Sequence, residues 1–248
     1  MRNPAGTGPR TADNRPLPLA SLADLRQTSY RLLSQAFLYP DGARVAALVE
    51  TAAELAAAGD SLSRFAFFGQ WKPLLMRLMG LDRSDETVMQ RRYVSLFSVN
   101  VTGVPCPPYE SVYREAGGRP TGWLTSLVER EYAIAGLSPS QGLGELPDHV
   151  AMEMEFMAVL CGREREACRR MHLGENEKAL RAQKSFLDHH LTVWLPEFSR
   201  ALAAADAGGV YAALGEAASV FVAHDRDLVS ALLESGAGAG DVGGGEAT

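Results

Sequence analysis

Apolar residues recur at helical spacing along most of this chain. Between Leu22 and Phe37 they return every three or four positions, as they do on the buried face of a helix. The same spacing returns in the ranges 45–59, 65–80, 121–136, 147–162, 177–194 and 210–233. Glycine or proline interrupts the pattern between most of these ranges. The pattern predicts an all-α protein, a helical bundle of about ten helices.

One segment conflicts with this pattern. Residues 91–101, RRYVSLFSVNV, are rich in β-branched and aromatic side chains, which favour a strand. A lone strand needs a partner, and no second convincing strand is present in the sequence. We therefore interpret the segment as the end of a helix that runs into a loop.

Two irregular links and two tails divide the chain. The range 104–122 is rich in proline and glycine and is expected to form a long loop. The range 137–146 separates two apolar halves, residues 20–136 and 147–234, and is predicted to be a hinge. Residues 1–19, which lack the apolar run of a secretory signal, and the Gly/Ala-rich residues 235–248 are predicted to be disordered tails.

Composition excludes several classes of partner. The formal net charge is −6, so the chain lacks the basic footprint that binding to nucleic acid or to an anionic membrane requires. No apolar run approaches the roughly 18 residues that span a bilayer, so stable membrane insertion is not expected. Three cysteines without a CxxC pair argue against a disulfide framework or a structural zinc site. We expect a protein of the reducing cytoplasm.

The stretch GELPDHVAMEMEFMAVLCG, residues 144–162, carries the candidate chemistry. Pro147 suits the first position of a helix, and Asp148 would then lie in the first turn, where the helix dipole favours a carboxylate. His149 and Glu153 are four residues apart, so their side chains can pair on the helix surface. The simplest interpretation is a core histidine held by Glu153.

Two interpretations that assign chemistry to His149 remain as alternatives. The first is a metal-binding helical-bundle protein that uses His149 and Glu153, with His172, His189 and His190 as further ligands. Such bundles usually carry paired ligand motifs on facing helices, and the sequence has none. The second is a hydrolase, for which Ser111 would be the candidate nucleophile, but no nucleophile-elbow motif surrounds it. We therefore expect no enzymatic activity.

Two motifs resemble the TorD/DmsD family of redox-enzyme maturation chaperones. Residues 145–149, ELPDH, followed by Met154 and Met157, resemble its signature E-x-P-D-H-x(4)-L-x(2)-M. Met154 stands where the signature usually has leucine, which is a mild change of similar volume. Residues 109–113, YESVY, follow two prolines and resemble the aromatic-x-Ser-x-aromatic loop of the family.

Two further stretches support the resemblance. Residues 37–40, FLYP, resemble the usual end of the first helix, and residues 186–198 resemble the penultimate helix with a proline, Pro196, that ends it. Four matches in the expected order cover roughly residues 22–230.

The resemblance implies a TorD-like fold of two helical halves, as a monomer or a homodimer that swaps domains through the hinge. It implies a cytoplasmic chaperone that binds the twin-arginine signal peptide and the apo form of a molybdopterin oxidoreductase subunit. The chaperone assists cofactor insertion and proofreading before export, and needs no cofactor itself. Some family members bind guanine nucleotides weakly, but no Walker-type loop supports that here.

A twin-arginine peptide presents two cations beside an apolar segment that favours helix. Its receptor needs carboxylates for the arginines and an adaptable apolar groove, which methionine can line. We expect Asp148 on the rim of such a groove as the arginine contact, with His149 fixing the local geometry through Glu153. The full set of expected peptide-binding residues is Tyr109, Glu110, Ser111, Tyr113, Glu145, Pro147, Asp148, His149, Met152 and Met154.

Overall fold

The computed structural model describes residues 17–98, 103–115, 122–138 and 144–240. Within these ranges the chain forms helices and no strand, which confirms the all-α prediction. The elements are α1 (Leu19–Ala36), α2 (Gly42–Ala57), α3 (Gly59–Leu62), α4 (Phe68–Met79), α5 (Arg83–Phe97), α6 (Glu110–Arg114), α7 (Trp123–Ile134), α8 (Val150–Arg169), α9 (Leu173–Phe186), the π-helical turn η1 (Leu187–Leu191), α10 (Thr192–Ala205) and α11 (Val210–Gly240).

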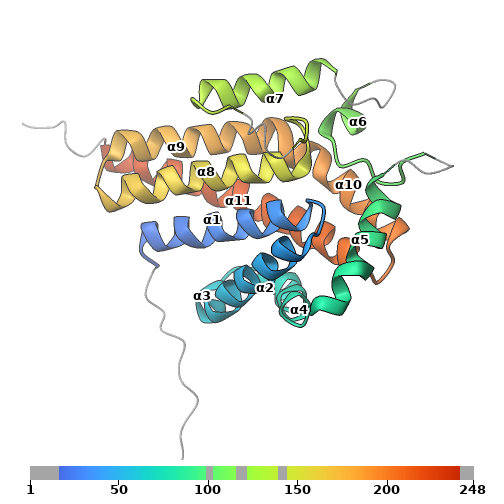
Figure 1. Cartoon of the computed structure of the whole chain (residues 1–248). Helices are drawn as coiled ribbons and strands as arrows, with labels where there is room; N and C mark the ends of the chain where they lie inside the picture. The colour runs from blue at the N-terminus through green and yellow to red at the C-terminus, as the bar shows by residue number, and fades with distance from the viewer. Residues whose placement is uncertain (1–16, 99–102, 116–121, 139–143, 241–248) are drawn as a thin grey trace, which may run out of the picture.

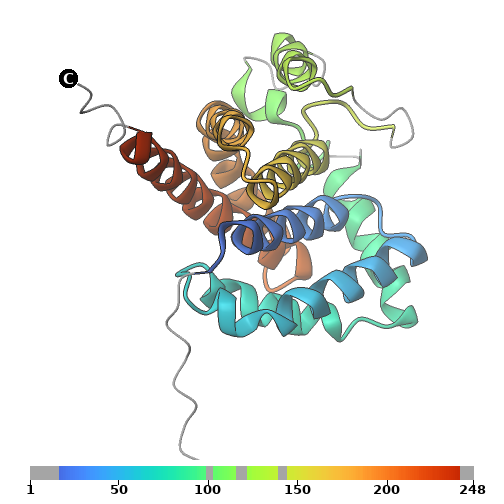
Figure 2. The ribbon, with the colours of Figure 1, turned by 90° about the vertical axis from the view of Figure 1, so that its left-hand side faces the viewer.

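Helix α8 lies in the middle of the bundle (Figure 1). It packs against α1 on one side and α9 on the other, and α11 packs against α10 and α9. Helices α2, α3 and α4 form a layer on the far side of α1, as both views show (Figures 1 and 2). Helix α7 lies on the outer side of α8 and α9.

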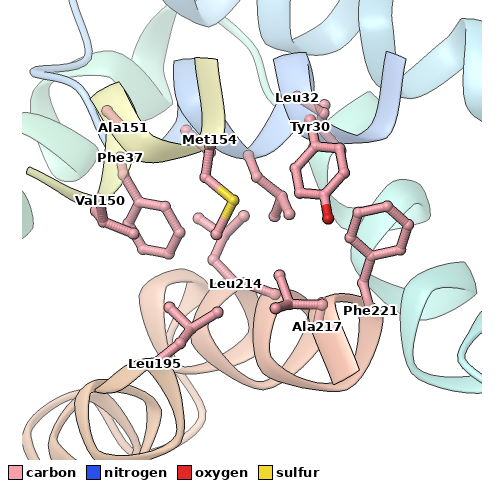
Figure 3. Packing of buried hydrophobic residues seen from close by; sticks show 14 of the residues in the cluster. Tyr30, Leu32, Phe37, Val150, Ala151, Met154, Leu195, Leu214, Ala217 and Phe221 are labelled. Atoms are coloured by element: carbon pink, nitrogen blue, oxygen red, sulfur yellow. The ribbon is translucent and has the colours of Figure 1, made fainter. Parts of the chain in front are cut away.

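The sequence explains why α8 is central. Its apolar residues cover nearly its whole circumference, and such a helix must be surrounded by others. Met154 and Met157 are fully buried. Figure 3 shows the Met154 thioether in the core between Tyr30 of α1 and Leu214 of α11. Thioether chains adapt to irregular gaps, so methionine suits a position where several helices meet.

A buried ion network ties four helices together. Arg26 of α1 donates to Glu164 of α8 (2.5 Å) and to both carboxylate oxygens of Asp225 of α11 (2.5 and 3.0 Å). Its guanidinium also donates to Gln183 of α9, which in turn donates to Glu164 (2.9 Å). The Tyr30 hydroxyl completes the set by donating to Asp225 (2.7 Å). The charged side chains are at most 3% exposed.

This network makes the packing of the helices specific. Two carboxylates share one guanidinium away from water, so each oxygen depends on a hydrogen bond for its stability. Helices α1, α8, α9 and α11 can therefore approach one another in the one arrangement that satisfies all of these groups.

Several predicted boundaries need correction. The range 91–101 begins as helix, as predicted, and α5 ends at Phe97. Pro196 does not end its helix but lies inside α10, near the start of that helix, which begins at Thr192 directly after η1. The hydroxyl and the N–H of Thr192 both donate to the carbonyl of Leu187, the hydroxyl at 2.7 Å. The predicted C-terminal tail, residues 235–248, overlaps the end of α11, which continues to Gly240.

Residues 1–16 and 241–248 of the predicted tails lie outside the described residues, whereas Leu19 already begins α1. Residues 139–143 of the predicted hinge also lie outside them, so the hinge stays a prediction. No helix of the described ranges is long and apolar enough to cross a bilayer.

Replacing Arg26 tests the network. Arg26→Met leaves Glu164 and Asp225 buried without their cation, and we expect a loss of about 3–5 kcal/mol in the free energy of unfolding. The matched control is Arg181→Met, which removes the exposed i, i+4 pair with Glu177 and should cost less than about 1 kcal/mol. Urea unfolding measures both. Equal losses in the two variants would show that the buried network does not stabilise the fold.

Candidate functional site

The two motifs singled out in the sequence meet in space. Tyr109 and His149 form an isolated antiparallel bridge. The N–H of Glu110 donates to the carbonyl of Asp148 (2.9 Å), and the N–H of Val150 donates to the carbonyl of Pro108 (2.8 Å). The predicted 104–122 loop contains the short helix α6 at residues 110–114. We call the bridged segments 108–111 and 145–150 the clasp.

Asp148 is buried within the clasp. Its side chain is fully buried and accepts from the backbone N–H (3.1 Å) and the hydroxyl (2.5 Å) of Ser111. Ser111 lies in the first turn of α6, so the Asp148 carboxylate caps α6 from another part of the chain. The prediction that Asp148 lies on the rim of a groove is wrong for this conformation, because the carboxylate satisfies donors inside the protein.

His149 begins α8. It is the N-cap residue, and its Nδ1 accepts from the N–H of Ala151 (3.1 Å). The helix therefore starts at Val150 instead of at Pro147 as predicted, since the histidine ring provides the capping acceptor. The ring packs edge-on against Tyr109 with centroids 5.1 Å apart. Burial lowers the pKa of His149 to about 3, so the ring is neutral at pH 7.

Glu153 has a different partner from the one predicted. It accepts from the indole N–H of Trp194 (3.0 Å), whereas the nearest carboxylate to His149 is Glu145, at 3.8 Å from Nε2. The predicted pair of His149 and Glu153 is wrong, because the N-cap role turns the ring toward the helix end. Burial, followed by the negative charge of Glu110, raises the pKa of Glu153 well above its ordinary value of 4.5.

Glu110 joins the clasp to the C-terminal helices. Its carboxylate contacts Nδ1 of His190 in η1 (2.8 Å) and the guanidinium of Arg114. Arg114 also donates to the carbonyl of His189 (2.6 Å). In the described ranges no three His, Cys, Asp or Glu side chains are grouped as metal ligands would be. The metal-binding alternative loses its basis with the pair of His149 and Glu153.

Burial divides the ten predicted contact residues into two groups. Tyr109, Tyr113, Glu145 and Pro147 are partly exposed. Glu145 also accepts from the hydroxyl of Tyr109 (3.0 Å). The buried group comprises Glu110, Ser111, Asp148, His149, Met152 and Met154. The accessible part of the predicted site therefore comprises these four partly exposed residues, and the buried part supports it.

The structure also contains a groove that sequence reasoning missed. A hollow of about 790 Å³ lies where α7 covers α8 and α9 incompletely. Its apolar lining comprises Ile134, Ala135, Phe156, Leu160, Ala167, Ala179 and Ala182. Ile134, at the end of α7, is 69% exposed. Gly136, with φ of 70°, then turns the chain away so that α7 stops short of the α8–α9 turn.

Two further apolar side chains stand at the α8–α9 turn beside this groove. Met171 and Leu173 are more than four-fifths exposed and flank His172, which lines the groove. The signal in the sequence is two large apolar residues within RRMHLGE, a polar segment with no helical stripe. An exposed apolar area of this kind is typical of a binding surface.

Comparison with known proteins identifies the family. The family model for the nitrate reductase delta subunit matches residues 49–200, which include both motifs of the clasp. The chain belongs to the nitrate reductase delta subunit family. This confirms the resemblance to the TorD family that the two motifs indicated.

Relatives in this family carry names of chaperones. The chain is 34% identical over 158 residues to the selenate reductase assembly chaperone protein of Thauera selenatis, covering 64% of this chain and 79% of that protein. It is 30% identical over 179 residues to the chlorate reductase assembly chaperone protein of Ideonella dechloratans, covering 72% and 77%. It is 32% identical over 130 residues to the chaperone protein TorD of Vibrio cholerae, covering 51% of this chain but 56% of that protein.

A solved structure supports the fold. A protein from Archaeoglobus fulgidus, described as a redox enzyme maturation protein, aligns with a TM-score of 0.53 and 21% identity. The alignment covers 79% of this chain and 93% of that one. At this identity the likeness supports the TorD-like helical fold and nothing further.

Because Asp148 is buried, its replacement should lower the stability of the fold. Asp148→Ala deletes the charged acceptor of both Ser111 donors, and we expect a loss of about 1.5–3 kcal/mol in unfolding free energy. Asp41→Ala is the control, because Asp41 caps the exposed start of α2 and should cost about 1 kcal/mol. In a double-mutant cycle with Ser111→Ala, the two losses should be less than additive. Full additivity would mean that Asp148 does not stabilise the clasp through Ser111.

The buried titratable groups predict a stability maximum. In the unfolded chain His149 takes up a proton below about pH 6.5, whereas in the folded chain its pKa is lowered to about 3. Stability therefore falls as the pH drops from about 6.5 to about 3. The unfolded chain releases the proton of Glu153 near 4.5 while the folded chain keeps it, so stability falls as pH rises above 4.5. Each group changes the free energy of unfolding by at most about 1.4 kcal/mol per pH unit, and the two effects oppose each other between about pH 4.5 and pH 6.5.

Urea unfolding across pH 3 to 9 measures this dependence. We expect Glu153→Gln to remove the loss above pH 6.5, and His149→Asn, which keeps a capping acceptor, to remove the loss at low pH. Profiles that stay parallel to wild type in both variants would contradict the assignment.

Proposed function

We propose that this protein is a cytoplasmic chaperone that binds the twin-arginine signal peptide of a molybdopterin oxidoreductase subunit before export. The observation that carries the proposal is the clasp, which joins the two signature motifs of the family. The names of the relatives as reductase assembly chaperones support a client of this class and a role without catalysis. By holding the apo subunit and its signal peptide, the chaperone delays export until the cofactor is inserted.

In this proposal the apolar part of the peptide lies in the groove between α7, α8 and α9. The clasp and the groove lie along the same helix, since α8 starts at Val150 and its residue Arg163 lines the groove. At 1.5 Å per residue these positions are about 20 Å apart. A helical peptide of about 13 residues spans that distance, which is compatible with one signal peptide reaching both places.

The charges around the groove are mixed, since four cations and three carboxylates line it. Three of the four cations are already engaged, because Arg163 donates to the carbonyl of Ala135 (2.6 Å), Arg170 pairs with Glu166 (2.6 Å) and Arg181 pairs with Glu177 (2.6 Å). By contrast, the rim carboxylates Glu131 and Glu175 make no ion pair within the described ranges. At the clasp, Glu145 is partly exposed. These carboxylates leave acceptors for arginine.

Substitution of Ile134 tests the proposal. Ile134→Asp places a charge on the apolar lining without disturbing the core, and should weaken binding of the peptide at least tenfold. Val88→Asp on α5, where the side chain is similarly exposed at 63%, should stay within about twofold of wild type. Calorimetry with a synthetic twin-arginine peptide measures both. No binding by wild type would refute the function, and equal binding by both variants would refute the groove.

A further inference from the structure

An arginine of the protein itself pairs with a buried carboxylate of the clasp, that of Glu110. The guanidinium of Arg114 contacts the Glu110 carboxylate and donates to the carbonyl of His189 (2.6 Å). The Glu110 side chain is fully buried, whereas the Arg114 side chain is 26% exposed. The cation thus reaches inward from the surface and covers Glu110.

The surroundings of Glu110 suit a guanidinium. Glu110, Asp148 and Glu153 are all fully buried, and the charges of Glu110 and Asp148 both raise the pKa of Glu153. Among the described residues, Arg114 is the one arginine or lysine bonded to any of these three carboxyls. Oxygen Oδ1 of Asp148 is buried and has no hydrogen-bond partner within the described ranges. Such an unsatisfied acceptor is unusual and indicates unused capacity for a donor.

The position of Arg114 allows it to leave. It is the last residue of α6, a helix of five residues, and its charged group already contacts solvent. Rotation of its side chain into water needs no rearrangement of the core, because arginine is stably hydrated at a surface. Its departure would uncover Glu110 and the carbonyl of His189.

We infer that Glu110 and the carbonyl of His189 form an arginine-binding site, which Arg114 occupies in the free protein and which an arginine of the client peptide takes over. The inference rests on the proposed function and adds to it a competition between Arg114 and an arginine of the peptide for the same site. An internal competitor lowers the apparent affinity in proportion to the fraction of molecules in which the site is free. One nitrogen of Arg114, Nη1, contacts both acceptors. The site then favours arginine over lysine, because a guanidinium is more weakly hydrated than an ammonium and loses less on entering a partly buried ion pair.

Arg114→Gln removes the competitor. Binding of a twin-arginine peptide should tighten about tenfold in calorimetry, as expected if Arg114 occupies the site in about nine molecules of ten. The matched control is Arg130→Gln, which removes an exposed cation from α7 and should change the affinity by less than about twofold. A twin-lysine peptide should gain less than about threefold from Arg114→Gln.

A double variant separates site competition from general electrostatics. Arg114→Gln with Glu110→Gln should lose the gain, because the carboxylate that the peptide's arginine would take is gone. If Arg114→Gln does not fold, Arg114→Lys, which keeps the charge without the planar fork, should give a gain of about threefold.

The outcomes distinguish the inference from the proposed function. If wild type binds the peptide and the Arg114 variants bind it no more tightly than the Arg130 control, the inference is wrong and the function stands. A gain that survives in the double variant also overturns the inference. If neither wild type nor any variant binds, the proposed function fails and the inference fails with it.

Discussion

The carboxylates that α8 carries into the interior determine the arrangement of the helices around it. Glu164 needs Arg26 and Gln183, and these come from α1 and α9. Glu153 needs the indole of Trp194, which comes from α10. An unpaired buried carboxylate costs several kcal/mol, so each contact fixes a neighbouring helix as firmly as apolar packing does. Apolar burial drives these helices together, and the carboxylates select one packing among many.

The same constraint places the candidate site. Asp148 precedes α8 and caps α6 through Ser111, so the loop between α5 and α7 is held at the start of the central helix. The two family motifs are therefore one structural unit, and much of their sequence serves to hold the clasp together. What this unit presents to solvent is Tyr109 with Glu145, and Arg114 over Glu110. The groove lies farther along α8, where α7 ends at Ile134.

The sequence predicted the helices well because their stripes are long, but it did not predict that the two family motifs meet. The sequence did not predict where individual helices begin and end, because contacts between residues distant in the sequence determine those positions. The start of α8 depends on the ring of His149 as a capping acceptor, and the burial of Asp148 depends on Ser111, 37 residues away. The groove was not predicted because it arises where α7, which is shorter than the helices beneath it, leaves part of α8 and α9 uncovered. No periodicity in the sequence reports that difference in length.

In the proposed function one peptide engages both the clasp and the groove, and a methyl NMR titration tests this most directly. The sequence contains a single isoleucine, Ile134, so isoleucine labelling yields one resonance from the groove. Methionine labelling adds Met171 at the α8–α9 turn and Met76, 62% exposed on α4, as a control. On titration with a twin-arginine peptide, Ile134 and Met171 should shift with one common affinity while Met76 stays fixed, and replacing the two arginines by lysines should weaken that affinity. A peptide that binds in calorimetry while Ile134 and Met171 remain unshifted would contradict the account.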